Sequence, residues 1–419
     1  MSRANVIAHG DPALSSVASP LSPARTRLAL LALALGGFGI GATEFVAMGL
    51  LPNLAHDLLP ALASAHPAAA NAQASWLVSA YALGVVVGAP TIATLAARFP
   101  RKQLLLCLAA TFTVATVASA LLPSFGLVLL ARFVAGLPHG AYFGVASLVA
   151  ASLMGPGRRA RGVAVVLAGL TISNIIGVPA ITLLGQATSW RVAYLAVAAI
   201  FAASFVAIAF LVPFQDGDPA ATMKRELQAF GRVQVWFALL IGAVGFGGFF
   251  AVYTFISPLV TDVTGLGVHF VPVVLIVVGV GMTVGNLVGG WSADRNIMRS
   301  IFIFFGVFAL SLAGLALTAS SIAGLLIFTF MVGASAAALS PAIQTRLMDV
   351  AGNSQTLAAA VNHASLNLGN SLGAFLGGVT IVAGLGYVSP SWVGLGLCVP
   401  GVALAVASVV LERRRPIAR

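Results

Sequence analysis

Twelve long apolar segments constrain the fold of this chain more than any other feature of its sequence. Each has about 20 residues or more, the length that an α-helix needs to cross the hydrocarbon core of a bilayer. Because lipid offers no partner for backbone N–H and C=O groups, we expect an all-α integral membrane protein. The segments lie near residues 28–53, 74–97, 103–123, 125–153, 162–185, 190–212, 233–260, 270–292, 300–319, 322–346, 356–384 and 389–411.

The composition excludes several classes of protein. Only 7% of the residues are charged, against about 25% in an average soluble domain, so neither a soluble enzyme nor a disordered protein fits. The net charge of +11 does not indicate nucleic-acid binding, because the cations are scattered between apolar segments. Cys107 and Cys398 lie within apolar segments, which predicts buried free thiols and no disulfide or metal site.

The Lys and Arg residues predict the orientation of the spans. All 21 of them except Arg132 and Arg191 fall on one side when the segments cross the membrane alternately. Cytoplasmic loops carry such an excess, so we expect both termini in the cytoplasm and a multi-pass protein of the cell (inner) membrane. The predicted domains are a cytoplasmic tail (1–27), a six-helix bundle (28–212), a cytoplasmic linker (213–231), a second six-helix bundle (232–411) and a cytoplasmic tail (412–419).

An internal repeat relates the two halves of the chain. With an offset of 197, Gly84, Val87, Gly88, Ala96 and Arg98 fall on Gly281, Val284, Gly285, Ala293 and Arg295. With an offset of 196, Leu170, Asn174 and Gly177 fall on Leu366, Asn370 and Gly373. Matches at nearly constant offset are typical of parallel repeats in transporters, so we expect two pseudo-symmetric bundles around a central cavity.

Short motifs recur at equivalent places in the halves. The loop after the eighth segment matches G-x-x-x-D-R-x-G-R-R at Gly290, Asp294, Arg295 and Arg299, with Ile297 and Met298 in place of the second glycine and the cation after it. The loop after the second segment has Ala97 in place of the aspartate but keeps the cations Arg98, Arg101 and Lys102. Arg132 precedes Gly136 and Gly140 in the fourth segment, and Gly177-Val178-Pro179 interrupts the fifth.

In these motifs the chain resembles the major facilitator superfamily over essentially its whole length. The stretches around Glu44, His139 and Asn367 to Asn370 are similar to the arabinose-efflux and chloramphenicol-resistance permeases among the drug:proton antiporters. The resemblance implies the major facilitator fold. It also implies gating roles for the following residues: Arg98, Arg101, Lys102, Gly177, Pro179, Gly290, Asp294, Arg295 and Arg299.

Ionisable residues within spans are the candidates for chemistry. A charged group in hydrocarbon is unfavourable, so Glu44 and Arg132 require a role. They lie at similar depth, and either a structural ion pair or proton coupling accounts for them. His139 follows Arg132 by seven residues, on the same helix face, and is either a proton relay or a structural hydrogen-bonding partner.

Other polar and aromatic residues are candidates for a substrate cavity. His363, Asn367 and Asn370 are spaced i, i+4, i+7 and form a polar stripe on one helix, which either faces the cavity or packs on a neighbour. Asn174 is the repeat counterpart of Asn370. Phe249 and Tyr253 belong to an aromatic run in the seventh segment that fits a cavity wall or lipid contact equally well.

These features together predict a secondary transporter that works by alternating access. The expected function is export of a small molecule in exchange for protons, with the proton gradient as energy source and no cofactor. Proton-coupled uptake is the alternative, and a membrane-embedded enzyme or passive channel is a remote one. No Walker loop, H-E-x-x-H motif or cysteine pair occurs, so the chain is not expected to be an enzyme. Expected partners are the solute, protons and the lipid bilayer, with a monomeric protein; substrate identity is left open.

Overall fold

The computed structural model describes residues 22–96, 98–155, 158–217, 231–351 and 355–414. Within these ranges the chain is helical and has no strands, and twelve helical spans are long and apolar enough to cross a membrane. These spans are Pro23–Gly49, Pro67–Ile92, Arg101–Leu121, Phe125–Met154, Arg161–Ala187, Trp190–Leu211, Val233–Thr254, Val268–Ala293, Ile297–Thr318, Ile322–Val350, Val361–Val382 and Ser389–Arg414. The multi-pass all-α membrane fold expected from the sequence is confirmed.

The first half of the chain forms one bundle. Its elements are α1 (Pro23–Gly49), α2 (Leu51–Leu58), α3 (Pro60–Ala65), α4 (Pro67–Ala74), α5 (Trp76–Ala96), α6 (Arg101–Leu121), α7 (Phe125–Gly136), α8 (His139–Met154), α9 (Arg159–Ile172), η1 (Ser173–Gly177), α10 (Val178–Ala187) and α11 (Trp190–Leu211). Within this bundle α1 packs on α9 and α11, α5 packs on α7, and α6 packs on α11.

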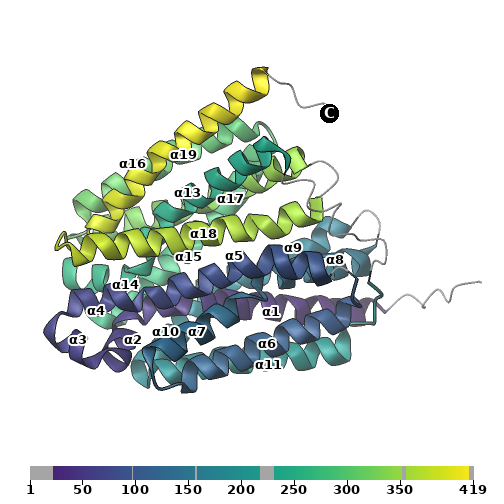
Figure 1. Cartoon of the computed structure of the whole chain (residues 1–419), viewed down its shortest axis with the longest axis horizontal. Coiled ribbons are helices and arrows are strands. Elements are labelled where there is room, and N and C mark those ends of the chain that lie inside the picture. The colour runs from purple at the N-terminus through teal and green to yellow at the C-terminus, as the bar shows by residue number, and fades with distance from the viewer. Residues whose placement is uncertain (1–21, 97, 156–157, 218–230, 352–354, 415–419) are drawn as a thin grey trace, which may run out of the picture.

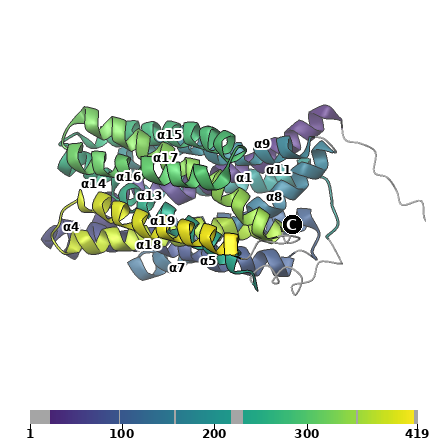
Figure 2. The same cartoon turned by 90° about the horizontal axis from the view of Figure 1, so that it is seen from above.

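The second half forms the other bundle. Its elements are α13 (Val233–Thr254), α14 (Ile256–Pro258), η3 (Leu259–Val263), η4 (Val268–Phe270), α15 (Val271–Ala293), α16 (Ile297–Thr318), α17 (Ile322–Ala351), α18 (Gln355–Val382) and α19 (Ser389–Arg414). α15 packs on α17, and α13 packs on α18 and α19. The bundles meet mainly where α5 lies against α18 (Figure 1), and also where α10 and η1 contact α15. The spans run lengthwise through the molecule (Figure 2), and α19 is inclined to α18 (Figure 1).

The two ends of the molecule differ in character. The basic end is where α1 begins and α19 ends, and it carries Arg25, Arg101, Arg299 and Arg413. The loop end carries the short helices α2, α3 and α4, at the left of Figure 1. The predicted linker 213–231 joins the bundles at the basic end, but its residues 218–230 lie outside the described ranges.

Prolines interrupt two spans of the first bundle. Pro138 separates α7 from α8 because it lacks the N–H that would continue the helix. Before Pro179 the chain forms the π-helical turn η1, in which the Val178 N–H donates to the Ser173 carbonyl five residues earlier. Such single π turns relieve a helix where the normal hydrogen-bond ladder is broken, and they are frequent at functional sites.

Glycines let helices of each bundle approach closely at equivalent positions of the repeat. A Cβ at Gly88 would lie 2.0 Å from the Leu137 carbonyl oxygen, and one at Gly285 would lie 1.9 Å from that of Ala334. These positions are therefore restricted to glycine by the α5–α7 and α15–α17 contacts.

One sequence expectation about burial is wrong. Cys398 is buried, but Cys107 is exposed on α6. An apolar span does not imply burial of each residue, because the outer faces of membrane helices are apolar where they contact lipid.

Candidate functional site

A cavity of about 290 Å³ lies between the two bundles. Its walls come from α1, α8, α9 and η1 of the first bundle and from α13, α15, α17 and α18 of the second. Its polar lining consists of Glu44, His139, Thr171, Asn174, Thr283, Asn286, Ser340, Gln344, Asn362, His363 and Asn367. A polar cavity enclosed by apolar spans is suited to hold a solute within the membrane.

Glu44 lines this cavity and links the bundles. Its side chain belongs to α1 and is buried, and its Oε1 accepts a hydrogen bond of 3.4 Å from Asn370 Nδ2 on α18. Asn370 itself lies behind the cavity wall, where this contact holds it, rather than in the lining as expected. The polar stripe on α18 is therefore divided, since His363 and Asn367 face the cavity and Asn370 faces Glu44.

Arg132 is fully buried inside the first bundle. Its Nη1 donates to Thr43 Oγ1 at 3.0 Å, and its guanidinium carbon lies 4.5 Å from the ring centroid of Tyr81 and 5.5 Å from that of Tyr194. Within the described residues the ion pairs are Arg191–Asp57 and Arg346–Glu412, so the structural Glu44–Arg132 pair considered from the sequence is not formed here. Thr43 and Glu44 are consecutive on α1 and point about 100° apart, which gives each a different partner.

His139 connects three helices. Tyr81 Oη and His139 Nδ1 are 3.0 Å apart, and the His139 ring centroid lies 5.5 Å from that of His363 across the bundle interface. His363 also stacks on Phe143, with 5.0 Å between centroids. Both His139 and Arg132 thus contact Tyr81, consistent with the expected common face of the fourth span despite its interruption at Pro138.

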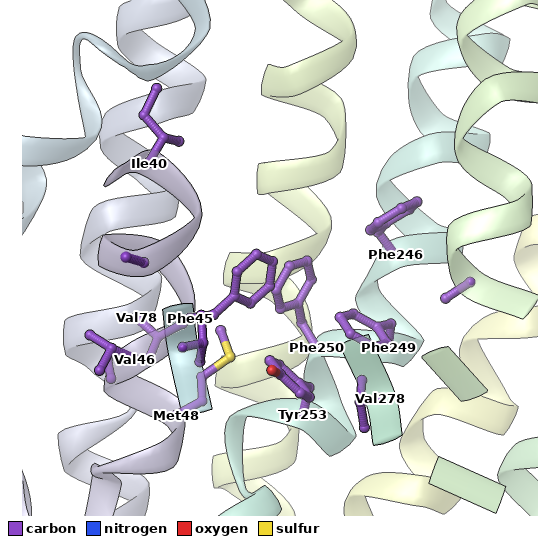
Figure 3. Close-up of a cluster of buried hydrophobic side chains, with 14 of the residues drawn as sticks. Ile40, Phe45, Val46, Met48, Val78, Phe246, Phe249, Phe250, Tyr253 and Val278 are labelled. Carbon is purple, nitrogen blue, oxygen red and sulfur yellow. The ribbon is translucent and has the colours of Figure 1, made fainter. Parts of the chain in front are cut away.

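An aromatic layer closes the loop-end side of the cavity. Phe45 of α1 stacks on Phe250 of α13 with 6.0 Å between centroids, and its ring edge meets Tyr253 at 5.5 Å (Figure 3). Phe246 and Phe250 line the cavity. Phe249 and Tyr253, which were expected in the lining, stack on each other at 5.0 Å outside it. α13 runs toward the loop end, so Tyr253 lies beyond the cavity floor.

The residues with expected gating roles lie mostly at the basic end. Asp294 caps the C-terminus of α15 and is exposed, as are Arg295, Arg299 and Arg98. Arg295 stacks on Trp291 at 3.4 Å and donates to its carbonyl oxygen.

The remaining gating residues contact their own bundle. Lys102 Nζ donates to the Ala209 carbonyl oxygen at 2.7 Å, and the Arg101 N–H donates to that of Gln215 at 2.9 Å. A Cβ at Gly290 would have no neighbouring atom within 4 Å, while a Cβ at Gly177 would lie 2.5 Å from Phe38 Cζ. Pro179 follows the π turn η1, which places Asn174 in the cavity wall.

Sequence reasoning missed Tyr81 and six polar residues of the lining, among them Thr171, Thr283 and Ser340. Tyr81 holds both Arg132 and His139, and Asn286, Gln344 and Asn362 belong to the cavity lining. The signal was present, because each is a polar side chain within an apolar segment, the same criterion that selected Asn367.

The fold and the central cavity define a membrane transporter built from two six-helix bundles. The Major Facilitator Superfamily matches residues 33–353 and 273–419, and the chain belongs to this family.

Relatives and solved structures agree with this assignment. The chain is 40% identical to "Inner membrane transport protein YdhP" of Escherichia coli (strain K12), covering 92% of this chain and 96% of the relative. It is 32% identical to "Chloramphenicol resistance protein" of Streptomyces lividans, covering 91% and 95%. Its fold is similar to the crystal structure of a D-xylose-proton symporter, with a TM-score of 0.72, 16% identity, and coverage of 91% of this chain and 97% of the other.

Proposed function

We propose that this transporter exports a small molecule in exchange for protons across the inner membrane. The observation that carries the proposal is the position of Glu44. It lines the cavity in one bundle while its hydrogen bond reaches Asn370 in the other. A carboxyl group placed there can meet the solute in the cavity. Its hydrogen bond to Asn370 must also change when the two bundles move apart.

The neighbours of Glu44 supply a physical basis for coupling. Asn370 Nδ2 donates to the carboxylate, and Asn370 Oδ1, which has no partner in the described structure, is free to accept from the protonated acid after the amide rotates. Arg132 Nε and Nη2 also lack partners there. A carboxylate that leaves Asn370 has these two guanidinium nitrogens of the same bundle as its alternative partners, so bundle movement and proton release are linked.

Export is favoured over uptake by the curated relatives. One relative carries the name of a chloramphenicol resistance protein, and resistance is consistent with removal of a compound from the cell. The solved symporter supports the shared fold alone. We expect the basic end to face the cytoplasm because of its Lys and Arg residues. The solute would then reach the cavity from the cytoplasm, the side from which an exporter takes it.

Everted membrane vesicles test direction and coupling together. After respiration acidifies the lumen, addition of a transported solute should release protons from it, and an uncoupler should abolish solute accumulation. We would start with chloramphenicol, and vesicles carrying Glu44→Gln are the matched control. Solute-induced acidification of the lumen instead would identify an uptake symporter, and solute flux that is indifferent to uncoupler would exclude proton coupling.

Cysteine labelling tests the orientation separately. In a variant without Cys107 and Cys398, an impermeant thiol reagent should label Ser64→Cys on intact cells and Arg413→Cys only after lysis. The two positions are exposed and lie at opposite ends of the molecule. Labelling of Arg413→Cys on intact cells would reverse the orientation.

A further inference from the structure

Two histidines from opposite bundles meet at the wall of the cavity. His139 begins α8 of the first bundle, and His363 belongs to α18 of the second. Their ring centroids lie 5.5 Å apart, with 53° between the ring planes, and both side chains belong to the lining. Imidazole is the most common protein ligand of metal ions, so this pair is a candidate metal site.

The separation of the rings fits two ligands of one ion. A metal–nitrogen bond is about 2.0–2.1 Å long, which places the centroids of two imidazole rings on one tetrahedral ion about 5 Å apart, and farther apart as the angle at the metal widens. The observed 5.5 Å lies within that range. The nitrogen lone pairs lie in the ring planes, so rings stacked face to face cannot direct them at one ion, and the tilt of 53° excludes such stacking.

Tyr81 orients the His139 ring for this role. Tyr81 Oη lies 3.0 Å from His139 Nδ1, so this nitrogen already has a partner and Nε2 is the one left for a metal. In the tautomer with hydrogen on Nδ1, the Tyr81 oxygen accepts and the Nε2 lone pair is free. Histidine ligands typically donate their other ring N–H in this way, which fixes both the tautomer and the orientation of the ring.

Phe143 orients His363 by stacking. The two rings have 8° between their planes and 5.0 Å between centroids. His139 Nε2 and the two ring nitrogens of His363 have no hydrogen-bonding partner among the described residues, and none of these three atoms is fully enclosed. They differ in this from the amide oxygen of Asn367, which is enclosed. The ring nitrogens therefore retain surface that an ion in the cavity can reach.

The charges around the pair favour a cation. Glu44 is the one carboxylate of the described lining, and no Lys or Arg belongs to it. Arg132 is the opposing charge, because it packs on the ring of Tyr81, but it is fully buried behind the wall. A cleft lined by charge of one sign concentrates ions of the other sign. The carboxylate therefore attracts divalent cations to the cavity in which the two histidines lie.

We propose that His139 and His363 together bind one divalent ion of zinc, nickel or copper between the two bundles. These ions suit imidazole ligands, whereas Mg²⁺ prefers oxygen. The described structure contains no group of three or more His, Cys, Asp or Glu side chains that could hold a metal ion, so water supplies the remaining ligands. The site is independent of the direction and the proton coupling of transport proposed above.

Calorimetric titration of the purified full chain in lipid nanodiscs with Ni²⁺ tests the site. All proteins in the sample are free of histidine tags. The other possible ligands are removed by exchanging Cys107 and Cys398 for Ser, and His9, His56, His66 and His269 for Gln; of these histidines the last three are exposed. We expect one Ni²⁺ per chain with a dissociation constant below about 1 mM. Mg²⁺ is the control ion and should not displace it.

Substitutions separate a shared site from two independent histidines. His139→Gln, His363→Gln and the double variant should weaken binding equally, by at least about tenfold, because one ion needs both rings. Tyr81→Phe keeps both ligands and loses only the partner of His139 Nδ1, so it should weaken binding about tenfold, the lower end of the usual effect of such partners. Thr283→Val, elsewhere in the lining on α15, is the matched control and should bind normally.

Electron paramagnetic resonance of bound Cu²⁺ repeats the test with both histidines in place, so a variant that misfolds does not decide the outcome. The spectrum should show coupling of the ion to the nitrogens of two imidazole rings. Coupling to one ring overturns the proposal. So does the absence of saturable Ni²⁺ binding up to about 1 mM, or binding that either single histidine variant retains at full strength.

Discussion

Thr43 and Glu44 are neighbours in sequence, yet they bind groups in different bundles. Thr43 accepts from Arg132 within the first bundle, and Glu44 accepts from Asn370 of the second. The acid is thereby separated from the buried cation and held at the interface. A residue with this environment is suited to change partner during transport, which a closed Glu44–Arg132 ion pair would oppose.

Replacement of Glu44 by Gln should remove the dependence of transport on the proton gradient. The amide keeps the size and the contact with Asn370 but cannot release a proton. We expect solute exchange between vesicles at equal pH to persist while gradient-driven accumulation is lost. The readout is accumulation with and without uncoupler, and gradient-driven accumulation by Glu44→Gln at the wild-type level would transfer the coupling role to another group, with His139 the next candidate.

The hydroxyl group and the ring of Tyr81 have different partners, and one substitution separates their effects. Tyr81→Phe removes the hydroxyl group that meets His139 and keeps the ring beneath Arg132. We expect a loss of about 0.6 kcal/mol in stability, and at most about 1.7 kcal/mol, as for other hydrogen bonds between membrane helices. Thermal unfolding in detergent measures it. An unchanged midpoint would mean that His139 finds an equivalent partner, and Tyr81→Leu, which also loses the ring, should be clearly less stable.

At the scale of helices, glycine determines how closely neighbours approach. Gly84, Gly88, Gly281 and Gly285 each lie against a backbone carbonyl group of the adjacent helix. The equivalent placement in both bundles follows from the repeat that the sequence shows. Close backbone contact of this kind supplies packing energy where lipid provides no hydrophobic driving force.

Gly285→Leu should destabilise the second bundle. Even a Cβ would lie 1.9 Å from the Ala334 carbonyl oxygen, so α15 and α17 must separate. Overpacking typically costs about 1–3 kcal/mol, and a backbone clash places this variant at the upper end. Gly306→Leu on α16 has nothing within 4 Å of the new Cβ and is the matched control. Yield of folded protein and thermal midpoint distinguish the two, and equal behaviour would show that α15 can shift freely.

The sequence predicts the spans well and the cavity in part. Segment positions follow from apolar length alone, so the sequence limits agree with the helices to within several residues. The cavity lining depends on how two bundles meet, and this places Asn286 and Gln344 in the wall and Asn370 behind it. The π turn at Ser173–Gly177 also arises from context, because Pro179 breaks the ladder but packing determines where the extra residue is accommodated.

The contacts between the two bundles differ from one end of the molecule to the other. Toward the loop end, Asn71 Nδ2 donates to Tyr387 Oη at 2.8 Å, and Ser79 Oγ donates to the Ser371 carbonyl oxygen at 3.4 Å. The Phe45–Phe250 pair adds an apolar contact between the bundles in the same half. The exposed residues Asp294 and Arg299 lie at the other end. This arrangement is that of a transporter closed at its loop end.

A disulfide across the loop end should therefore stop transport. A Cβ at Gly378 on α18 would lie 3.6 Å from the Cβ of Ala72 on α4, close to the mean separation of about 3.8 Å in disulfides. In a background without Cys107 and Cys398, oxidation of the Ala72→Cys, Gly378→Cys pair should fix the bundles at this end. If transport requires them to rock apart there, it should fall at least about tenfold and return on reduction. Each single cysteine variant is the control for the substitution itself.

Solute binding from the basic end should survive oxidation, because the cavity lies on the far side of the aromatic layer. Full transport by the oxidised pair would show that the loop end does not open, and the solute would then need another route past Phe45 and Phe250.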